Sequence, residues 1–522
     1  MNNLLKKLLL TTSLLYAVQV ASGQTTANPD SALQTILDGL HGSRLSLQQA
    51  TEHALTNATS VRSAEAAYNA AEGTVRRESG AFDPAIFLSL NHSDDQQPTS
   101  SAFAGAPVLA TQQTLSRGGL RLNTAIGTQL ELSVNTSRLT TNSALATLNP
   151  EYDATGLLTL RQPLLAGFAA SARKGLSSAE EQLDAGKARY DQAVLAVKAE
   201  VERTYWDLYK AERDYAVQRL TCDRGREFLK ETQLRAETGL VGSNQVASAK
   251  TFLAEQELQL FDREESLGHQ SDVLAALIGV QPTDSTMRFL PVDAPPSDFK
   301  PEPIETLVAR AVKNNLDLQA AQKDVNAVQT LADAAQWEAL PQVDLIGSVG
   351  GNGLLGNAQL VSIPGFPTFT GPGGSYGDAL NQAIKRDYPT WSVGVELTIP
   401  IGLRSGLGEK DRLDAQVVSA QQRSVDFSRQ LEEQVRAAYR EVANGKGRLQ
   451  AAKDGVDAAQ EQVRIGLIEF RTGRVTAFEL VRLGEDFATA QQRYSDALVR
   501  TAKAAATLKQ LTSEESISTN TR

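Results

Sequence analysis

Cysteine, histidine and positive charge are all scarce in this sequence, and each shortage excludes a class of function. The one cysteine, Cys222, permits neither a disulfide within the chain nor a cysteine-based zinc site, so we expect an ordinary small helix residue there. The four histidines are scattered without a pair at metal-ligand spacing, so we expect no metal or other cofactor. The 51 basic residues are outnumbered by 61 acidic ones, and a net charge of −10 argues against nucleic-acid binding.

Long apolar runs are also missing, since no stretch approaches the 18 residues that a transmembrane helix needs. A shorter, mainly apolar run, residues 8–21, follows Lys6 and Lys7 and precedes the small residues Ser22 and Gly23. This order is typical of a secretory signal, so we expect residues 1–23 to be removed and the chain to be exported. Such a chain can enter a membrane only as a barrel of strands.

Proline is missing from four long stretches, which are the candidate helices because a helix interior excludes proline. These stretches are residues 30–83, 164–281, 304–340 and 401–522. Proline and glycine gather between them, in residues 84–163 and 341–400, where we expect strands. A proline-rich linker, residues 281–303, separates the two halves of the chain.

The two halves resemble each other. At an offset of 257 residues Pro84 aligns with Pro341, and at an offset of 234 residues Tyr205 aligns with Tyr439. Each half therefore predicts a helix, a strand segment, a long helix, a turn and a second long helix. The offset changes within the strand segments, where differences in loop length are expected.

This internal two-fold repeat sets the expected boundaries. The first repeat, residues 24–280, is predicted to contain a helix at 45–82, strands within 84–163, and long helices at 168–236 and 243–280. The second repeat, residues 304–512, is predicted to contain a helix at 304–340, strands at 342–350 and 391–400, and long helices at 404–470 and 476–512. Residues 513–522 are predicted to be a disordered tail.

The long helices carry a narrow apolar seam. Its members recur at intervals of three and four residues, and they are Tyr190, Val194, Val197, Val201, Tyr205 and Leu208. Intervals near 3.5 indicate coiled-coil packing. A helix of roughly 68 residues is about 100 Å long, so the sequence predicts a rod or a tube.

The strand segments alternate between apolar and polar residues. In residues 391–399 every odd position is apolar and every even position is polar or glycine, and residues 86–91, 130–135 and 343–349 follow a similar pattern. One interpretation is a one-faced sheet on a soluble core. We favour strands that face lipid, because the chain carries an export signal and Trp391 stands at a strand end, where interfacial aromatics gather.

Two short motifs match enzymes but fail on context. Residues 373–377 fit the nucleophile elbow of hydrolases, yet no histidine follows His269 to complete a triad. Residues 351–356 fit a dinucleotide-binding pattern but lead into a proline-containing loop instead of a helix. We interpret both as external loop sequence and expect no enzymatic activity.

Four passages carry a resemblance to a known family. They are the strand-to-helix passages 158–165 and 397–401 and the helix-turn-helix passages 238–241 and 472–475. In this order and in duplicate, they make residues 45–511 resemble the TolC-like outer membrane factors, also called outer membrane efflux proteins. The resemblance implies an α+β membrane protein. In that fold three chains each give four strands to a 12-stranded outer membrane β-barrel, which continues as a coiled-coil helical tunnel through the periplasm.

The resemblance also implies a function and partners. The trimer would be the passive exit duct of a tripartite efflux or type I secretion system, carrying small molecules or polypeptides to the exterior. Its partners would be a periplasmic adaptor protein, an inner-membrane pump and outer membrane lipid. The alternative interpretation of the residues is a periplasmic coiled-coil scaffold without a channel.

Site residues follow from the same resemblance. Adaptor docking is implied at the two helix tips, which are formed by Gly239, Leu240, Val241, Gly473, Arg474 and Val475. At both glycines we expect a left-handed backbone, which glycine adopts without a Cβ penalty. Glu479 stands where the family carries an aspartate in the tunnel entrance, so three copies would form a carboxylate ring that selects cations. Arg482, one turn on, stands where family members often carry a second acid.

The sequence departs from the family pattern in two respects. Gln245 and Phe470 replace an aspartate and a tyrosine of well-studied members, so a polar latch between the tips is not expected at these positions. About 70 residues separate the first strand from the passage before Pro163, and a strand at 128–137 within them predicts an added external hairpin.

Overall fold

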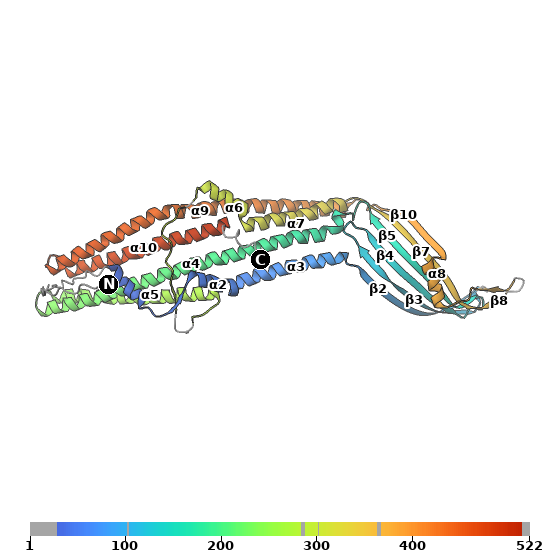
Figure 1. Ribbon diagram of the computed structural model, residues 1–522, viewed down its shortest axis with the longest axis horizontal. Helices are drawn as coiled ribbons and strands as arrows, with labels where there is room; N and C mark the ends of the chain where they lie inside the picture. Colours follow the sequence, from blue (N-terminus) through green and yellow to red (C-terminus); the bar gives the residue numbers. More distant parts are fainter. Residues whose placement is uncertain (1–28, 102–103, 283–287, 301, 363–366, 514–522) are drawn as a thin grey trace, which may run out of the picture.

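The molecule is a long rod of helices with a sheet at one end (Figure 1). The computed structural model describes residues 29–101, 104–282, 288–300, 302–362 and 367–513. The expected signal peptide (1–23), part of the expected linker and almost all of the expected tail lie outside these residues.

Four helices run side by side toward the sheet and form a single layer. They are α3 (Thr59–Ser79), α4 (Ala170–Glu237), α7 (Leu316–Glu338) and α9 (Arg404–Arg471), each packed on the next in this order. Away from the sheet, α4 pairs with α5 (Ser243–Ile278) and α9 pairs with α10 (Ala477–Thr512). Contacts between α4 and α10 join these two hairpins (Figure 1). In the described part of the chain, no helix has an apolar stretch of the length needed to cross a membrane.

The two hairpins have equal dimensions. α4 and α9 each contain 68 residues, and α5 and α10 each contain 36. Arg404 lies 234 residues after Ala170, the same offset that aligns Tyr205 with Tyr439. The long helices begin and end within two residues of the predicted positions.

The two shorter predicted helices, 45–82 and 304–340, are each interrupted, and in this respect the prediction was wrong. α2 (Leu47–Asn57) is separated from α3 at Ala58, and α6 (Ile304–Asn314) from α7 at Asn315. Both junction residues have extended backbones, with ψ of 126° and 124°. At Asn315 the side chain accepts a hydrogen bond from the Leu318 N–H and so caps the new helix. Because the breaks involve no proline, the proline pattern did not reveal them.

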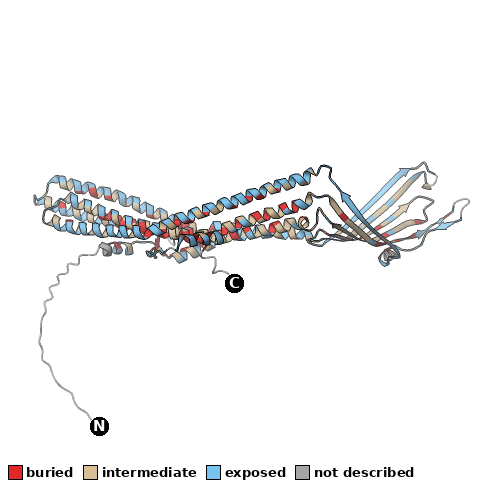
Figure 2. Ribbon diagram, turned by 90° about the horizontal axis from the view of Figure 1, so that it is seen from above, coloured by how far each residue is buried: buried red, intermediate tan, exposed pale blue. Residues whose placement is uncertain are grey.

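The main buried core lies at the middle of the rod (Figure 2). Here β1 (Ser43–Leu45) pairs in parallel with β6 (Phe289–Pro291), and α1 (Pro29–Asp38) packs on α4. The buried Tyr205 hydroxyl donates to the Leu45 carbonyl (2.9 Å) and accepts from the backbone N–H of Asp293 (3.1 Å). Burial raises the pKa of Tyr205, which stays neutral. One side chain of α4 thus connects β1 and the segment directly after β6 to the long helix.

The sheet contains six antiparallel strands in the order β10-β7-β5-β4-β3-β2. They are β2 (Ala85–Pro98), β3 (Val108–Asn123), β4 (Gln129–Thr141), β5 (Leu148–Pro163), β7 (Gln342–Ala358) and β10 (Tyr388–Thr398). The expectation of four strands per chain is therefore wrong. The segment predicted as an added external hairpin supplies β3 and β4, which pair with β2 and β5 inside the sheet.

The two enzyme-like motifs have structural roles in this region. Residues 351–356 lie within β7 and not in a loop, so that interpretation was wrong. Residues 373–377 lead into α8 (Tyr376–Lys385), and the Ser375 hydroxyl caps this helix by accepting from the Asp378 N–H (3.3 Å). A small hairpin of β8 (Leu360–Val361) and β9 (Phe369–Thr370) lies beyond the end of β7.

The strand register separates an apolar face from a polar one. Neighbouring residues of β4 differ sharply, since Leu132 is 50% exposed and Ser133 is 2% exposed. In a curved sheet, side chains crowd together on the concave face and spread apart on the convex face, so the apolar face is convex. Its exposed members are Ile86, Leu88, Leu90, Leu120, Leu132, Leu158, Val349, Trp391, Val393, Val395 and Leu397.

Replacement of the central tyrosine should loosen the middle of the rod. We expect Tyr205→Phe to cost about 1–3 kcal/mol of stability, because the buried Leu45 carbonyl loses its donor and the partly buried Val292 and Asp293 N–H groups lose their acceptor. The measurement is the thermal midpoint of the purified protein by circular dichroism. Tyr439→Phe is the matched control, since Tyr439 has no hydrogen bond in the described part of the chain. Equal losses in both variants would contradict this role of Tyr205.

Candidate functional site

Both helical hairpins end in the same type of turn, at the end of the rod opposite the sheet (Figure 1). Gly239 and Gly473 follow α4 and α9, and each has a φ of +75°. In both turns the residue after the glycine donates its N–H to a carbonyl five residues back, which is the Schellman termination. These hydrogen bonds join Leu240 N to Arg235 O (2.9 Å) and Arg474 N to Glu469 O (2.9 Å). The predicted left-handed backbone is confirmed at both glycines.

The tips present different side chains. Leu240 is 76% exposed at the first tip, whereas the exposed residue at the matching position of the second tip is Arg474. Val241 and Val475 are half-buried. Phe478, next to the second tip, is also largely exposed. The pair therefore offers apolar surface and one cation rather than two copies of a single surface.

An aromatic contact joins the two hairpins just behind the tips. Phe470 of α9 is only 4% exposed, and the Arg235 guanidinium carbon of α4 lies 4.1 Å from the centroid of its ring. The Phe228 ring packs on the same phenylalanine, with 6.0 Å between centroids. Arg235 is held in turn by Glu231, at 2.8 Å. A cation–π contact thus connects α4 to α9. Phe470 stands out in the sequence but Arg235 does not, because nothing in the sequence indicates which cation meets the ring.

Glu479 lies in the first turn of α10, where its backbone N–H donates to the Thr476 hydroxyl (3.3 Å). Its side chain is exposed, and its charge is favourable at a helix N-terminus. No ion pair joins Glu479 to Arg482, although both lie among the described residues. The carboxylate is therefore free to face solvent or a ligand.

A second acid lies deeper between the hairpins. Glu485 accepts a hydrogen bond from the Gln256 side chain of α5 (3.1 Å), and Gln256 accepts from Gln218 of α4 (2.8 Å). Burial raises the pKa of Glu485, and the nearby carboxylates of Glu255 and Asp486 raise it further. These amides connect three helices through groups that have little access to water.

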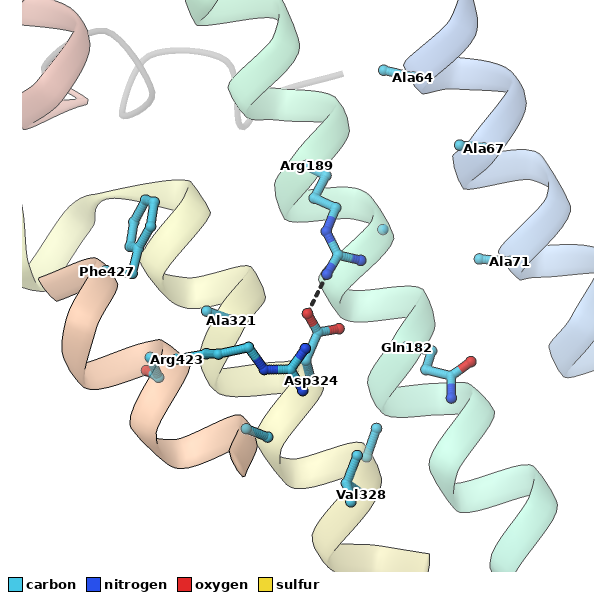
Figure 3. Close-up of a pocket in the computed structure, with 14 residues that line it drawn as sticks. Ala64, Ala67, Ala71, Gln182, Arg189, Ala321, Asp324, Val328, Arg423 and Phe427 are labelled. Carbon is cyan, nitrogen blue, oxygen red and sulfur yellow. Dashed lines mark hydrogen bonds and ion pairs between the residues drawn. The ribbon is translucent and has the colours of Figure 1, made fainter. Parts of the chain in front are cut away.

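A cavity of about 660 Å³ lies among α3, α4, α7 and α9 (Figure 3). All four members of one helix layer line it, so it lies on the concave side of that layer. One wall carries the small residues Ala64, Ala67 and Ala71, which leave space open. Arg189 of α4 forms an ion pair with Asp324 of α7, and Arg423 of α9 extends toward the same carboxylate. Most of the lining is therefore apolar, and Arg189, Asp324 and Arg423 are the charged side chains in it.

The concave face of the sheet is charged as well. Glu131 accepts from Arg117 (2.5 Å) and Arg121 (2.7 Å), and the Arg121 guanidinium lies 4.3 Å from the Phe87 ring centroid. Nearer the helices Arg161 pairs with the buried Asp344. Within the described residues, no group of three or more side chains is placed to hold a metal ion. Cys222 is buried, as expected for a helix residue.

Comparison with known proteins gives consistent matches. The sequence matches the family described as outer membrane efflux protein over residues 50–280 and 307–514. Nodulation protein T of Rhizobium leguminosarum bv. trifolii is 22% identical over 341 residues, which cover 64% of this chain and 67% of that protein. The counterpart from bv. viciae is 20% identical over 337 residues, which cover 63% of this chain and 64% of its own length.

Solved structures share the fold at low sequence identity. The outer-membrane channel OprN matches with a TM-score of 0.63 at 16% identity, covering 89% of each chain. The outer membrane protein VceC of Vibrio cholerae matches with a TM-score of 0.62 at 16% identity, covering 89% of this chain and 95% of that one. The long helices and the sheet are therefore an arrangement found in outer membrane channels.

Substitution of the tip glycines should destabilise the protein, whereas substitution of Gly484 inside α10 should not. We expect Gly239→Ala or Gly473→Ala to destabilise its turn by about 1–2 kcal/mol, because φ is positive there. Gly484→Ala, inside α10 and with open space around it, should instead stabilise its helix by about 0.8–1 kcal/mol. Amide hydrogen exchange, measured in the last turns of α4 and α9 for the tip variants and around position 484 of α10 for the control, gives the difference. Changes of the same sign at all three positions would contradict the assignment.

Proposed function

The chain belongs to the family of outer membrane efflux proteins, and we propose that it forms the exit duct through which a pump complex releases its substrates. The observation that carries this proposal is the division of the sheet into an apolar convex face and a charged concave face. Such a division suits a wall with lipid outside and water inside. On the concave side of the helix layer, Arg189, Asp324 and Arg423 add charged groups between the sheet and the middle of the rod.

The alternative, a periplasmic scaffold, fits the sheet less well. A scaffold would need protein to cover the convex face, because a large exposed apolar patch is unfavourable in water. Within the described residues α8 covers only part of that face, where it packs on β5 and β7. Trp391, Val393 and Val395 remain exposed. In the proposed duct, lipid would cover these side chains.

We propose that three copies close the wall. Among the described strands, β2 and β10 each have one edge without a partner, and unpaired backbone groups are costly in lipid. Six strands is an even number, so β2 of one copy and β10 of the next would run antiparallel. Three six-stranded sheets would give eighteen strands instead of twelve. Since barrel diameter grows roughly linearly with strand number, the duct would be about half as wide again.

At the other end of the rod the tips would meet the partners. We propose that a periplasmic adaptor contacts Gly239, Leu240, Val241, Gly473, Arg474 and Val475, and that an inner-membrane pump supplies small molecules or polypeptides. The exposed Leu240 offers apolar contact and Arg474 a cation. The helices would lie in the periplasm and the sheet in the outer membrane. Glu479, repeated three times, would place carboxylates around the entrance.

A pair of neighbouring substitutions separates duct from scaffold. Val395→Asp puts a charge on the convex face, whereas Gly394→Asp puts one on the concave face, where a new side chain meets open space. We expect Val395→Asp to cost about 1–2 kcal/mol per chain in lipid and to reduce the amount of membrane-inserted trimer. Gly394→Asp should insert normally. The measurement is native mass after extraction from outer membranes in mild detergent, and equal recovery of both variants would contradict the proposal.

The entrance charge can be tested separately. We expect Glu479→Gln to lower the preference for cations in planar-bilayer recordings and to weaken block by multivalent cations added from the tip side, since the ring loses its charge. Glu227→Gln, which removes an equal exposed charge about three turns before the first tip, should change neither property. Unchanged selectivity and block in Glu479→Gln would show that Glu479 is ordinary surface charge.

A further inference from the structure

A short helix covers part of the convex face at the end of the sheet far from the rod. α8 packs on β5 and β7, and its Ala379 and Ala383 are buried against Ala154 and Leu355. Figure 1 shows it lying across the sheet. The helix therefore rests on the face that we assign to lipid, and not inside the duct.

Glycines of β7 make room for this helix. A Cβ at Gly353 would lie 2.1 Å from the Ala379 carbonyl oxygen, and a Cβ at Gly351 would lie 2.4 Å from that of Ala383. Any other residue at either position would push the helix away. Residues 351–356, which match a dinucleotide-binding pattern, therefore include the glycines on which α8 packs.

The two flanks of α8 differ in polarity. The Gln382 side chain accepts a hydrogen bond from the Leu354 N–H (3.2 Å). Leu354 lies near the end of β7 that is far from the rod, so the side of α8 that carries Gln382 faces that end of the sheet. Residues of a helix are about 100° apart, which puts Leu380 and Ile384 on the opposite flank, toward the apolar band of the strands. Ile384 is 65% exposed there. Nothing in the described part of the chain therefore covers this apolar side chain.

Basic and aromatic residues follow the same helix. Lys385 and Arg386 are exposed at its end, and the Arg386 guanidinium donates to the Gly350 carbonyl (3.2 Å). On β10, which follows directly, Trp391 is 74% exposed on the convex face of the edge strand. Aromatic rings and cations beside an apolar surface are typical of the boundary between acyl chains and headgroups.

We propose that α8 is an interfacial helix that binds an anionic lipid surface, extending the lipid-facing wall beyond the strands. Ile384 and Leu380 lie against acyl chains, and Lys385 and Arg386 lie near the phosphates. The inference rests on the proposed function, since it requires the convex face to meet lipid. It adds that the outer leaflet is bound by a helix as well as by strands, and it names the residues that bind it.

Depth-dependent quenching of tryptophan fluorescence tests the proposal. The full chain is reconstituted into phosphatidylcholine–phosphatidylglycerol vesicles containing lipids with a nitroxide label near the headgroup or deep in the chain. The loss of signal in Trp391→Phe gives the quenching of Trp391 itself. In that background Ile384→Trp reports on α8, and Leu360→Trp reports on an exposed apolar position of β8 beyond the wall. Native mass and circular dichroism verify that each variant is assembled and folded.

The expected result is that Trp391 and the tryptophan at position 384 both lose about half of their emission to labelled lipid, the latter more to the shallow label. The tryptophan at position 360 should respond only to aqueous iodide. Quenching of Trp391 without quenching at position 384 would overturn the inference and leave the duct intact. Protection of position 384 from both lipid and iodide would mean that protein covers it, which also overturns the inference. Absence of lipid quenching at Trp391 would instead contradict the proposed function.

Discussion

The constraint that shapes this molecule is that every backbone N–H and C=O of a sheet needs a partner, most strictly where water is absent. The four inner strands of the sheet satisfy one another, but β2 and β10 each leave an edge open. Both edge strands carry their apolar side chains on the convex face, so joining copies edge to edge extends one continuous apolar surface. In the proposed duct, assembly, membrane insertion and width would therefore follow from a single requirement, and the number of strands in each chain would set the width.

The rod of helices continues from one end of the sheet (Figure 1). Four helices continue below the sheet as one layer, and their concave side carries the charges of Arg189, Asp324 and Arg423. At the middle of the rod, Tyr205 joins the long helix to β1 and to the segment after β6. At the tips, glycine turns reverse the chain, and Arg235 and Phe228 of α4 both pack on Phe470 of α9. These few side chains bury less apolar surface than the core at the middle of the rod, so they hold the tips more weakly.

Local sequence rules determined much of this architecture. Absence of proline and an apolar seam with intervals near 3.5 predicted the long helices to within two residues, because both properties act within one or two helical turns. Alternation with period 2 identified the apolar face of the strands before their order was known. The tip glycines were predicted from chirality, since only glycine accepts a positive φ without a Cβ penalty. The match to known outer membrane efflux proteins then agreed with the resemblance carried by short duplicated motifs.

Only the tertiary structure decided the features that depend on contacts between distant segments. β3 has few apolar residues and two central glycines, so it becomes a strand through hydrogen bonds to β2 and β4 and not through its own pattern. The breaks at Ala58 and Asn315 depend on how short helices pack against long ones. The sequence does not show which group packs closely on Gly351 and Gly353. In the folded chain this group is the backbone of α8. The contact between Phe470 and Arg235 could not be predicted either. A sequence shows which side chains can make a cation–π contact, but only the folded chain brings this arginine to this ring.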